Sequence, residues 1–305
     1  IIFILVYFCA KLLKMYELLQ KYKLTSLHLM VVILGFTGIL GKLISLDATY
    51  LVWYRMVFAC LSLALFLLFK KQLFSVSKKD FFGLLAVGTL VAIHWLCFFE
   101  SIKVSTVSVA VVCLSTSSLF SALIEPIFFK RKLLAYEVIM GVIVVLALAF
   151  VMGTDTQYLW GYIYGIASAF LGTLFTLFNA KYIKTVGAAQ ITMIEMLSGV
   201  LLISCFFLFQ QDFTVFTSSI SIADFYYLII LAVLCTAMIF VWMTEIMRHI
   251  TPYSLIMAIN LEPIYSIVLA LLIFGDKELM SSSFYIGSTI IIGVVFLEGY
   301  LKNKQ

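Results

Sequence analysis

The sequence predicts an all-α membrane protein, and two observations lead to that prediction. Hydrophobic residues make up 64% of the chain and charged residues only 11%, whereas a soluble domain has roughly 25% charged residues. The apolar residues also come in blocks of about 18 or more, the length that a helix needs to cross a bilayer. Transmembrane β-strands are excluded, because they would be about 10 residues long and would alternate polar with apolar residues.

Apolar blocks of this kind follow one another along nearly the whole chain. The ten blocks cover residues 27–45, 51–69, 81–101, 104–128, 133–152, 160–179, 190–209, 224–247, 253–274 and 284–301. The connections are short, so no loop could hold a soluble domain and any function must reside in the helix bundle. We therefore expect ten transmembrane helices, preceded by a cytoplasmic or interfacial segment at 1–26 and followed by a cytoplasmic tail at 302–305.

The positive charges predict the orientation in the membrane. With a cytoplasmic N-terminus, Lys and Arg fall on the inner side, except for Lys42, Lys103 and Lys277 on the outer side and Arg55 within a span. An excess of Lys and Arg in cytoplasmic loops is the rule for such proteins. We expect both termini in the cytoplasm and the cell inner membrane as the location. The net charge of +5 then needs no nucleic-acid partner.

The chain also matches itself when it is shifted by a fixed number of residues. At a shift of 145, Glu100 falls on Glu245, Lys103 on Arg248 and Thr106 on Thr251.

At a shift of 140, residues 53–69 fall on 193–209. The two halves, 27–152 and 160–301, each hold five predicted helices. An odd number makes the second half enter the membrane from the opposite side. Such inverted repeats are typical of secondary transporters, whose substrate site lies between the repeats.

Two stretches resemble a known family. They are ESIKVSTVSVAVVCLSTSSLFSAL at 100–123 and MTEIMRHITPYSLIMAINLEPIYSIVLALLIFGDKE at 243–278. Both are similar to corresponding segments of the EamA-type families in the drug/metabolite transporter superfamily, and Arg55 in WYRMVFA matches an arginine that these proteins often carry. The resemblance covers about 27–301 and implies a ten-helix secondary carrier, many of which export amino acids or other small metabolites.

One departure from the family pattern concerns the fourth helix. Ser118 stands where the family usually has proline, and Glu125–Pro126 follows eight positions after the expected pair. The two Glu-Pro pairs of the chain are therefore not expected to be symmetry mates.

Glu262 is the first candidate site residue. It lies near the middle of an otherwise apolar span, next to Pro263, which frees a backbone carbonyl near Ile259. A carboxylate inside the membrane indicates a functional site by default. Glu262 either lines a central cavity, where it binds an amino group or a proton, or holds the helices in register.

Other polar and aromatic residues within the spans are candidates for the cavity lining. Each has helix packing as its alternative: Asn260, Arg55, His94, Trp95, Ser115, Trp53 and Tyr265.

A second group of charged residues suggests gating or pairing between helices. Glu100 with Lys103 and Glu245 with Arg248 are i, i+3 pairs at helix ends. Glu195 occupies the position in the second half that Arg55 occupies in the first.

The favoured interpretation is a secondary active transporter that exports a small metabolite, such as an amino acid, by alternating access around a central cavity. An integral-membrane enzyme and a channel or receptor are the alternatives. The sequence contains no CxxC, HExxH or GxSxG motif, so no metal, cofactor or enzymatic activity is expected. The expected partners are the small-molecule substrate, the lipid bilayer and a proton as one candidate for the coupled ion, in a monomer or homodimer.

Overall fold

The computed structural model describes residues 23–72, 76–211, 214 and 220–302, and within these residues the protein is helical with no β-strand. Each of the ten predicted blocks contains helix. The helices are α2 (Lys23–Leu43), α3 (Ala48–Phe69), α4 (Lys78–Val104), α5 (Val107–Leu114), α6 (Ser117–Phe129), α7 (Ala135–Thr154), α8 (Leu159–Tyr182), α9 (Ala188–Gln210), α11 (Ile222–Ala232), α12 (Ile239–Ile246), α13 (Pro252–Ile259), α14 (Glu262–Phe274) and α15 (Ser282–Lys302). Most of the predicted N-terminal segment and residues 303–305 lie outside the described part.

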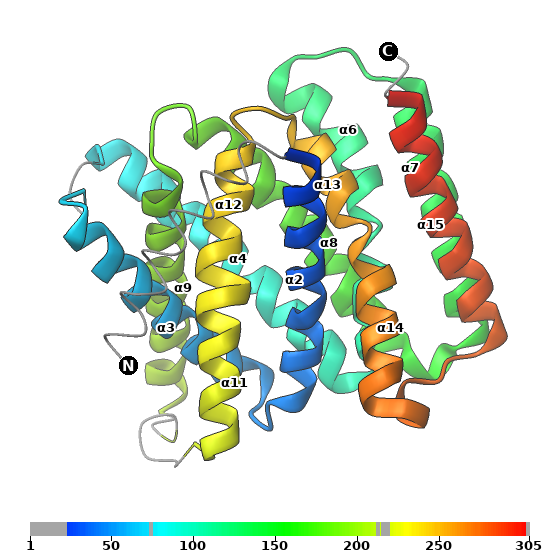
Figure 1. Cartoon of the computed structure of the whole chain (residues 1–305), viewed down its shortest axis with the longest axis horizontal. Helices are drawn as coiled ribbons and strands as arrows, with labels where there is room; N and C mark the ends of the chain where they lie inside the picture. Colours follow the sequence, from blue (N-terminus) through cyan, green and yellow to red (C-terminus); the bar gives the residue numbers. More distant parts are fainter. Residues whose placement is uncertain (1–22, 73–75, 212–213, 215–219, 303–305) are drawn as a thin grey trace.

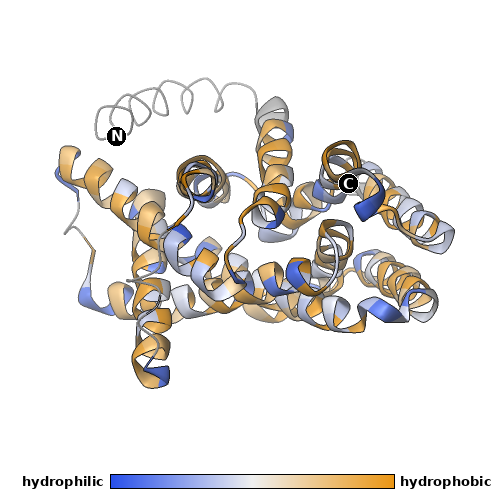
Figure 2. Cartoon of the chain, turned by 90° about the horizontal axis from the view of Figure 1, so that it is seen from below, coloured by the Kyte–Doolittle hydropathy of each residue, from blue (hydrophilic) through white to orange (hydrophobic). Residues whose placement is uncertain are grey.

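Eight helical stretches of the described residues are long and apolar enough to cross a membrane. The first and last predicted blocks correspond to shorter apolar helices, Leu27–Leu43 and Ser282–Leu297. The outer surface carries large apolar side chains, among them Phe209, Ile127 and Leu272, which are 88%, 81% and 77% exposed. Apolar colouring covers much of the helices in Figure 2, as expected for a protein that contacts lipid on its outside.

Two predicted spans are each broken once. The block 104–128 divides into α5 and α6, and the block 253–274 divides into α13 and α14. Pro263 explains the second break, because it stands at the start of α14, where its missing N–H costs nothing.

The first break, which was not predicted from the sequence, is built from hydroxyl groups. Thr116 donates to the Cys113 carbonyl at 2.7 Å, and Ser118 donates to the Ser115 carbonyl at 2.9 Å. Such local bonds compete with the helical ladder.

The two broken helices have the same construction. In each, 8 helical residues precede the break and 13 follow it. Their first halves start at equivalent caps. Thr106 accepts from the Val109 N–H at 3.1 Å, and Thr251 accepts from the Ser254 N–H at 3.2 Å. Since α5 packs against α14 and α13 against α6, the short half of each broken helix lies beside the long half of the other.

A different irregularity interrupts the span Ile222–Ile246. A π-helical segment, η2 (Val233–Met238), joins α11 to α12. Within it the Thr236 hydroxyl donates to the Leu231 carbonyl, five residues back, at 2.7 Å. Such π-bulges are frequent at functional sites, and this one directs Thr236 into the bundle.

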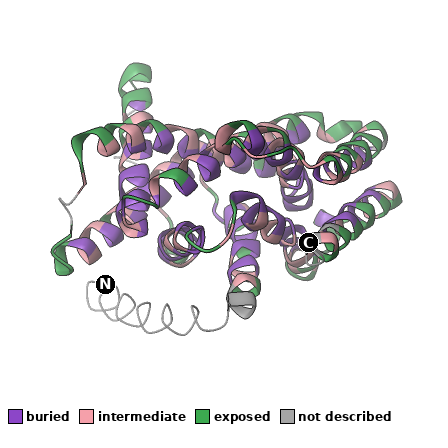
Figure 3. Cartoon of the chain, turned by 90° about the horizontal axis from the view of Figure 1, so that it is seen from above, coloured by how far each residue is buried: buried purple, intermediate pink, exposed green. Residues whose placement is uncertain are grey.

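Helix α4 runs through the centre and packs against α8, α9 and α3, while α7 and α15 form a pair at one edge (Figure 1). The approach of α4 to α9 is close. A Cβ atom at Gly88 would lie 2.7 Å from the backbone of Glu195, so only glycine fits there. Buried residues concentrate where the helices face one another (Figure 3).

Candidate functional site

A cavity of about 90 Å³ lies inside the bundle between helices of both sequence halves. A water molecule needs roughly 10–15 Å³ by this measure, so the cavity has room for several waters or a small solute. Its lining consists of Leu34, Thr37, Arg55, His94, Trp95, Phe98, Leu114, Ser117, Ala169, Gly172, Thr173, Phe175, Thr176, Phe240, Met243, Ile256, Ile259 and Glu262.

The cavity has one fixed positive charge and one carboxyl group. Arg55 on α3 is 1% exposed and Glu262 on α14 is 4% exposed. Among the described residues, neither forms an ion pair within 4.0 Å. Burying a charge is costly unless a partner or water compensates it. Arg55 and Glu262 attract each other without forming an ion pair, so both remain available to a ligand of opposite charge.

Arg55 is held by two contacts from different helices. Its Nε donates to the Thr236 hydroxyl at 2.5 Å, and its Cζ lies 3.8 Å from the centroid of the Trp95 ring. One further donor, Nη1, is buried without a hydrogen-bond partner. The π-bulge of η2 thus supplies the acceptor that fixes the arginine and leaves part of its donor capacity unused.

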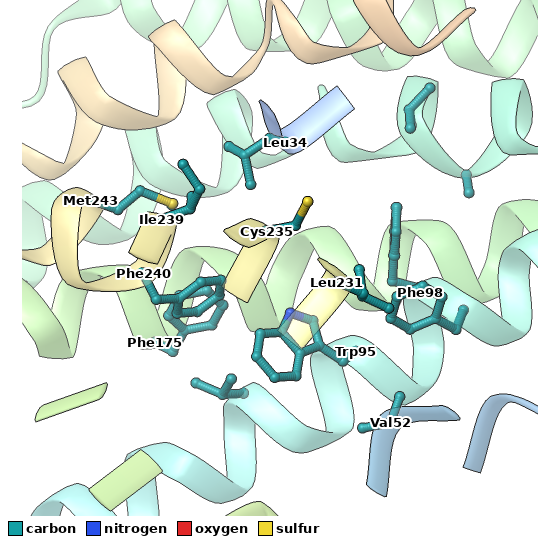
Figure 4. Close-up of a cluster of buried hydrophobic side chains, with 14 of the residues drawn as sticks. Leu34, Val52, Trp95, Phe98, Phe175, Leu231, Cys235, Ile239, Phe240 and Met243 are labelled. Carbon is teal, nitrogen blue, oxygen red and sulfur yellow. The ribbon is translucent and has the colours of Figure 1, made fainter. Parts of the chain in front are cut away.

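Aromatic rings form one wall of the cavity. The centroids of Trp95 and Phe240 are 5.0 Å apart in an edge-to-face arrangement, and Phe240 stacks on Phe175 at 5.9 Å. Figure 4 shows these rings gathered from α4, α8 and α12, with Met243 and Leu34 nearby. This wall offers an apolar surface to the uncharged part of a ligand.

His94 is fixed to α8 by Ser168. Its Nδ1 lies 2.7 Å from the Ser168 carbonyl oxygen and 2.8 Å from the Ser168 hydroxyl. The same hydroxyl donates to the His94 carbonyl at 3.0 Å. An Nδ1–H that donates to the carbonyl leaves Nε2 as an acceptor, so the ring can receive a hydrogen bond from a ligand.

The cavity also lies at the start of both long half-helices. Ser117 is the first residue of α6 and Glu262 the first residue of α14, and both line it. The two breaks touch, because Ser117 Oγ donates to Asn260 Oδ1 at 3.3 Å. A helix N-terminus carries a partial positive charge, and transporters direct such half-helix ends toward their substrates.

Of the residues predicted for the lining, Glu262, Arg55, His94 and Trp95 meet at this cavity, and the other four lie elsewhere. Asn260 is buried at the helix break, where Ser117 is its partner. Ser115 is fully buried in the other break. Trp53 donates from Nε1 to the Ser204 hydroxyl at 2.9 Å, and Tyr265 is half-buried farther along α14.

At the end of the bundle where α5 begins, which we call the α5 end, a carboxylate joins the two halves. Glu278 is 0% exposed and accepts from the Val107 and Ser108 N–H groups at 3.1 and 3.2 Å. It also accepts from the Ser108 hydroxyl at 2.9 Å and pairs with Lys42. We call Glu278 and Lys42 the α5-end latch.

The opposite end, where α13 begins, has an equivalent arrangement, which we call the α13-end latch. Glu125 on α6 accepts from the Tyr253 N–H at 2.7 Å and pairs with Arg131 at 3.2 Å. Arg131 also pairs with Glu137 at 2.6 Å. Tyr253 lies 145 residues after Ser108, so each broken helix is capped at the same position by a carboxylate from the other half.

The predicted i, i+3 pairs behave differently from each other. Arg248 Nε pairs with Glu245 at 2.9 Å. Lys103 instead donates to the Ile44 carbonyl at 2.6 Å, and no ion pair with Glu100 forms among the described residues. Glu195 is fully buried in α9, outside the cavity lining.

Several residues of these sites were missed by sequence reasoning. Glu278 ends the FGDKE stretch, but it follows the apolar block 253–274, so a search for polar residues within the spans does not include it. Phe175 and Phe240 are two of 28 phenylalanines, and no periodicity distinguishes them. Nothing in the sequence indicated the π-bulge that brings Thr236 to Arg55.

A helical protein with an apolar surface and a charged cavity among its helices belongs to the class of multi-pass membrane proteins. The EamA-like transporter family matches this chain twice, over residues 23–153 and 159–298. The chain belongs to that family and is a membrane transporter of the drug/metabolite type.

Solved structures share this fold. Of 27 matching chains, one described as "Crystal structure of protein" gives a TM-score of 0.66 at 13% sequence identity, and the match covers 89% of this chain and 95% of that one. At this identity the likeness concerns the fold alone. No curated protein matches the sequence.

Proposed function

We propose that the protein is a secondary active transporter that exports a small zwitterionic metabolite, such as an amino acid, by alternating access around the central cavity. We place it in the cell inner membrane, with ten spans and both termini in the cytoplasm. The expectation of export comes from the family resemblance.

The observation that supports this substrate class is the pair Arg55 and Glu262. Both line one cavity of about 90 Å³, and neither forms an ion pair with another described residue. A zwitterion offers a carboxylate to Arg55 and an ammonium group to Glu262, and its apolar part would contact the aromatic wall. One substrate would then neutralise both buried charges, which favours binding over an empty cavity.

The two broken helices support an alternating-access mechanism. Each begins at a latch at one end of the bundle and breaks beside the cavity. Discontinuous helices at the interface of inverted repeats surround the substrate site in many transporters. In this mechanism the latches open in turn, while Arg55 and Glu262 stay at the centre.

Uptake into liposomes tests the proposed function. Purified protein is reconstituted and given a panel of labelled amino acids, with and without a pH gradient. We expect saturable transport of some members of the panel and none by protein-free liposomes. If amino acids are not carried while organic anions or cations are, the zwitterion assignment is wrong.

Glu262→Gln tests the role of the carboxylate, because it keeps the shape and removes the charge. Losing a desolvated pair with an ammonium group weakens binding by roughly 2–5 kcal/mol, so a large rise in the dissociation constant is expected. Asp80→Asn, at the cap of α4, serves as the control. If the substrate affinity is unchanged but the response to a pH gradient is lost, Glu262 is a proton carrier. If neither the affinity nor the pH response changes, Glu262 has a structural role.

A further inference from the structure

We propose that Glu195 and Asn179 form an occluded proton-binding site, separate from the substrate cavity, that carries the coupling proton. The inference rests on the proposed transport function and extends it by naming where the ion binds.

The first observation is the isolation of the Glu195 carboxyl group. Glu195 is the eighth residue of α9 and is 0% exposed, and neither of its carboxyl oxygens has a hydrogen-bond partner. Among the described residues it forms no ion pair. With no ion pair and no hydrogen bond within 3.5 Å, only the nearby Asn179 side chain offsets the hydration that a carboxylate here would lose. The environment therefore suits the neutral acid.

The second observation is an unused acceptor beside it. Asn179 on α8 is 1% exposed, and its side chain interacts with that of Glu195. Its Oδ1 is also buried without a partner. An ionised carboxylate would add two more acceptors to this group. A single proton converts one carboxyl oxygen into a donor, which can bond to Asn179 Oδ1. One bound proton thus pairs Asn179 Oδ1 with one of the two unpaired Glu195 oxygens.

The third observation links this site to the substrate cavity. The residues of α8 that line the cavity lie on one face of that helix: Ala169, Gly172, Thr173, Phe175 and Thr176. Asn179 is three residues after Thr176, so it continues the same face beyond the cavity. A substrate that displaces α8 therefore changes the contact between Asn179 and Glu195.

Titratable groups on the elements packed against α9 do not neutralise Glu195. On α3, Arg55 is bonded to Thr236, and the Cys60 thiol donates to the Met193 carbonyl at 3.9 Å. On α4, His94 is bound to Ser168. On α12, Glu245 pairs with Arg248.

The proposed cycle conserves charge and atoms. On one side of the membrane a proton from water forms an O–H bond with the Glu195 carboxylate. When the opposite side opens and water reaches the group, that bond breaks and the proton enters the solution there. No electrons are transferred, and the substrate moves in the opposite direction.

The test separates net coupled transport from simple exchange in proteoliposomes. Glu195→Gln should keep substrate exchange between equal concentrations, because exchange needs no net proton movement. It should lose substrate accumulation driven by a pH gradient, down to the level without a gradient. Asp80→Asn should keep both activities. Wild-type accumulation in Glu195→Gln would overturn the proposal.

A second measurement does not depend on transport. Infrared spectra at neutral pH should contain the band of a protonated carboxyl group that is absent from Glu195→Gln. In Asn179→Leu the band should shift, because the acceptor is lost. Identical spectra for wild type and Glu195→Gln would overturn the proton site even if transport is confirmed. A clear band in a protein that carries no substrate would instead contradict the proposed function alone. If Glu195→Gln does not fold, the infrared band is compared between wild type and Asn179→Leu. A shifted band supports the proton site, and an unshifted band overturns it.

Discussion

The guanidinium group of Arg55 lies over the indole ring of Trp95, with its Cζ atom 3.8 Å from the ring centroid. A desolvated contact of this kind contributes about 2 kcal/mol. The same guanidinium bonds to Thr236 in the other sequence half. Arg55 therefore connects the two halves beside the cavity and has a fixed direction there before any substrate binds.

The Trp95→Leu variant removes the aromatic face under Arg55. Because the guanidinium loses its orientation, we expect the substrate dissociation constant to rise about tenfold, equivalent to about 1.4 kcal/mol. Titration calorimetry with the best substrate of the panel measures this. Trp160→Leu is the matched control, since Trp160 is 64% exposed. An equal effect of both substitutions would contradict a specific role for Trp95.

The Thr236→Val variant keeps the side-chain shape and removes the acceptor of Arg55 Nε. A buried donor left without its partner costs about 1–3 kcal/mol, so the thermal unfolding midpoint should fall. Thr89→Val is the control, because the Thr89 hydroxyl donates to the nearby Ala86 carbonyl on an exposed face. A midpoint equal to that of the control would mean that the hydrogen bond contributes little.

The Glu278→Gln variant weakens the α5-end latch by removing the charge that pairs with Lys42 and caps α5. We expect a cysteine at Ser117, in a cysteine-free background, to react faster with an impermeant thiol reagent applied from the α5 end. Asp276→Asn, two residues away and exposed, should leave the rate unchanged. An unchanged rate in Glu278→Gln would show that the latch does not control access.

Single cysteines test the predicted orientation. In intact cells, an impermeant reagent should label Lys277→Cys at the predicted outer side. Lys181→Cys, which is exposed at the end of α8, should react only after the membrane is permeabilised. Labelling of both in intact cells would contradict the predicted helix count.

The sequence predicts the helices well, because long apolar blocks have few other solutions in a membrane. Of the eight residues expected at the lining, four lie at this cavity, and two of them, Arg55 and Glu262, were singled out because charged side chains are rare within spans. The break at Asn260 could be expected from Pro263. The break at Ser115 could not, because hydroxyl groups bond to the backbone only when tertiary packing favours the distorted geometry.

The same reasoning could not identify contacts between distant residues. Glu278 reaches Ser108 across 170 positions, and Thr236 reaches Arg55 across 181. Such pairs depend on how helices cross, which no local pattern encodes. Trp53 and Tyr265 were predicted for the lining because of their type, but the direction in which each helix faces decides the outcome.

The equal 8- and 13-residue segments of the two broken helices have a thermodynamic consequence. In a carrier whose halves exchange roles, the two end states consist of nearly the same contacts, and most of their free energy cancels. What remains is the difference in free energy between the Glu278–Lys42 latch and the Glu125–Arg131 latch. About 1.4 kcal/mol changes the ratio of two states tenfold. Under the proposed alternating access, one substitution at a latch would therefore reverse which state predominates at rest, without altering the cavity.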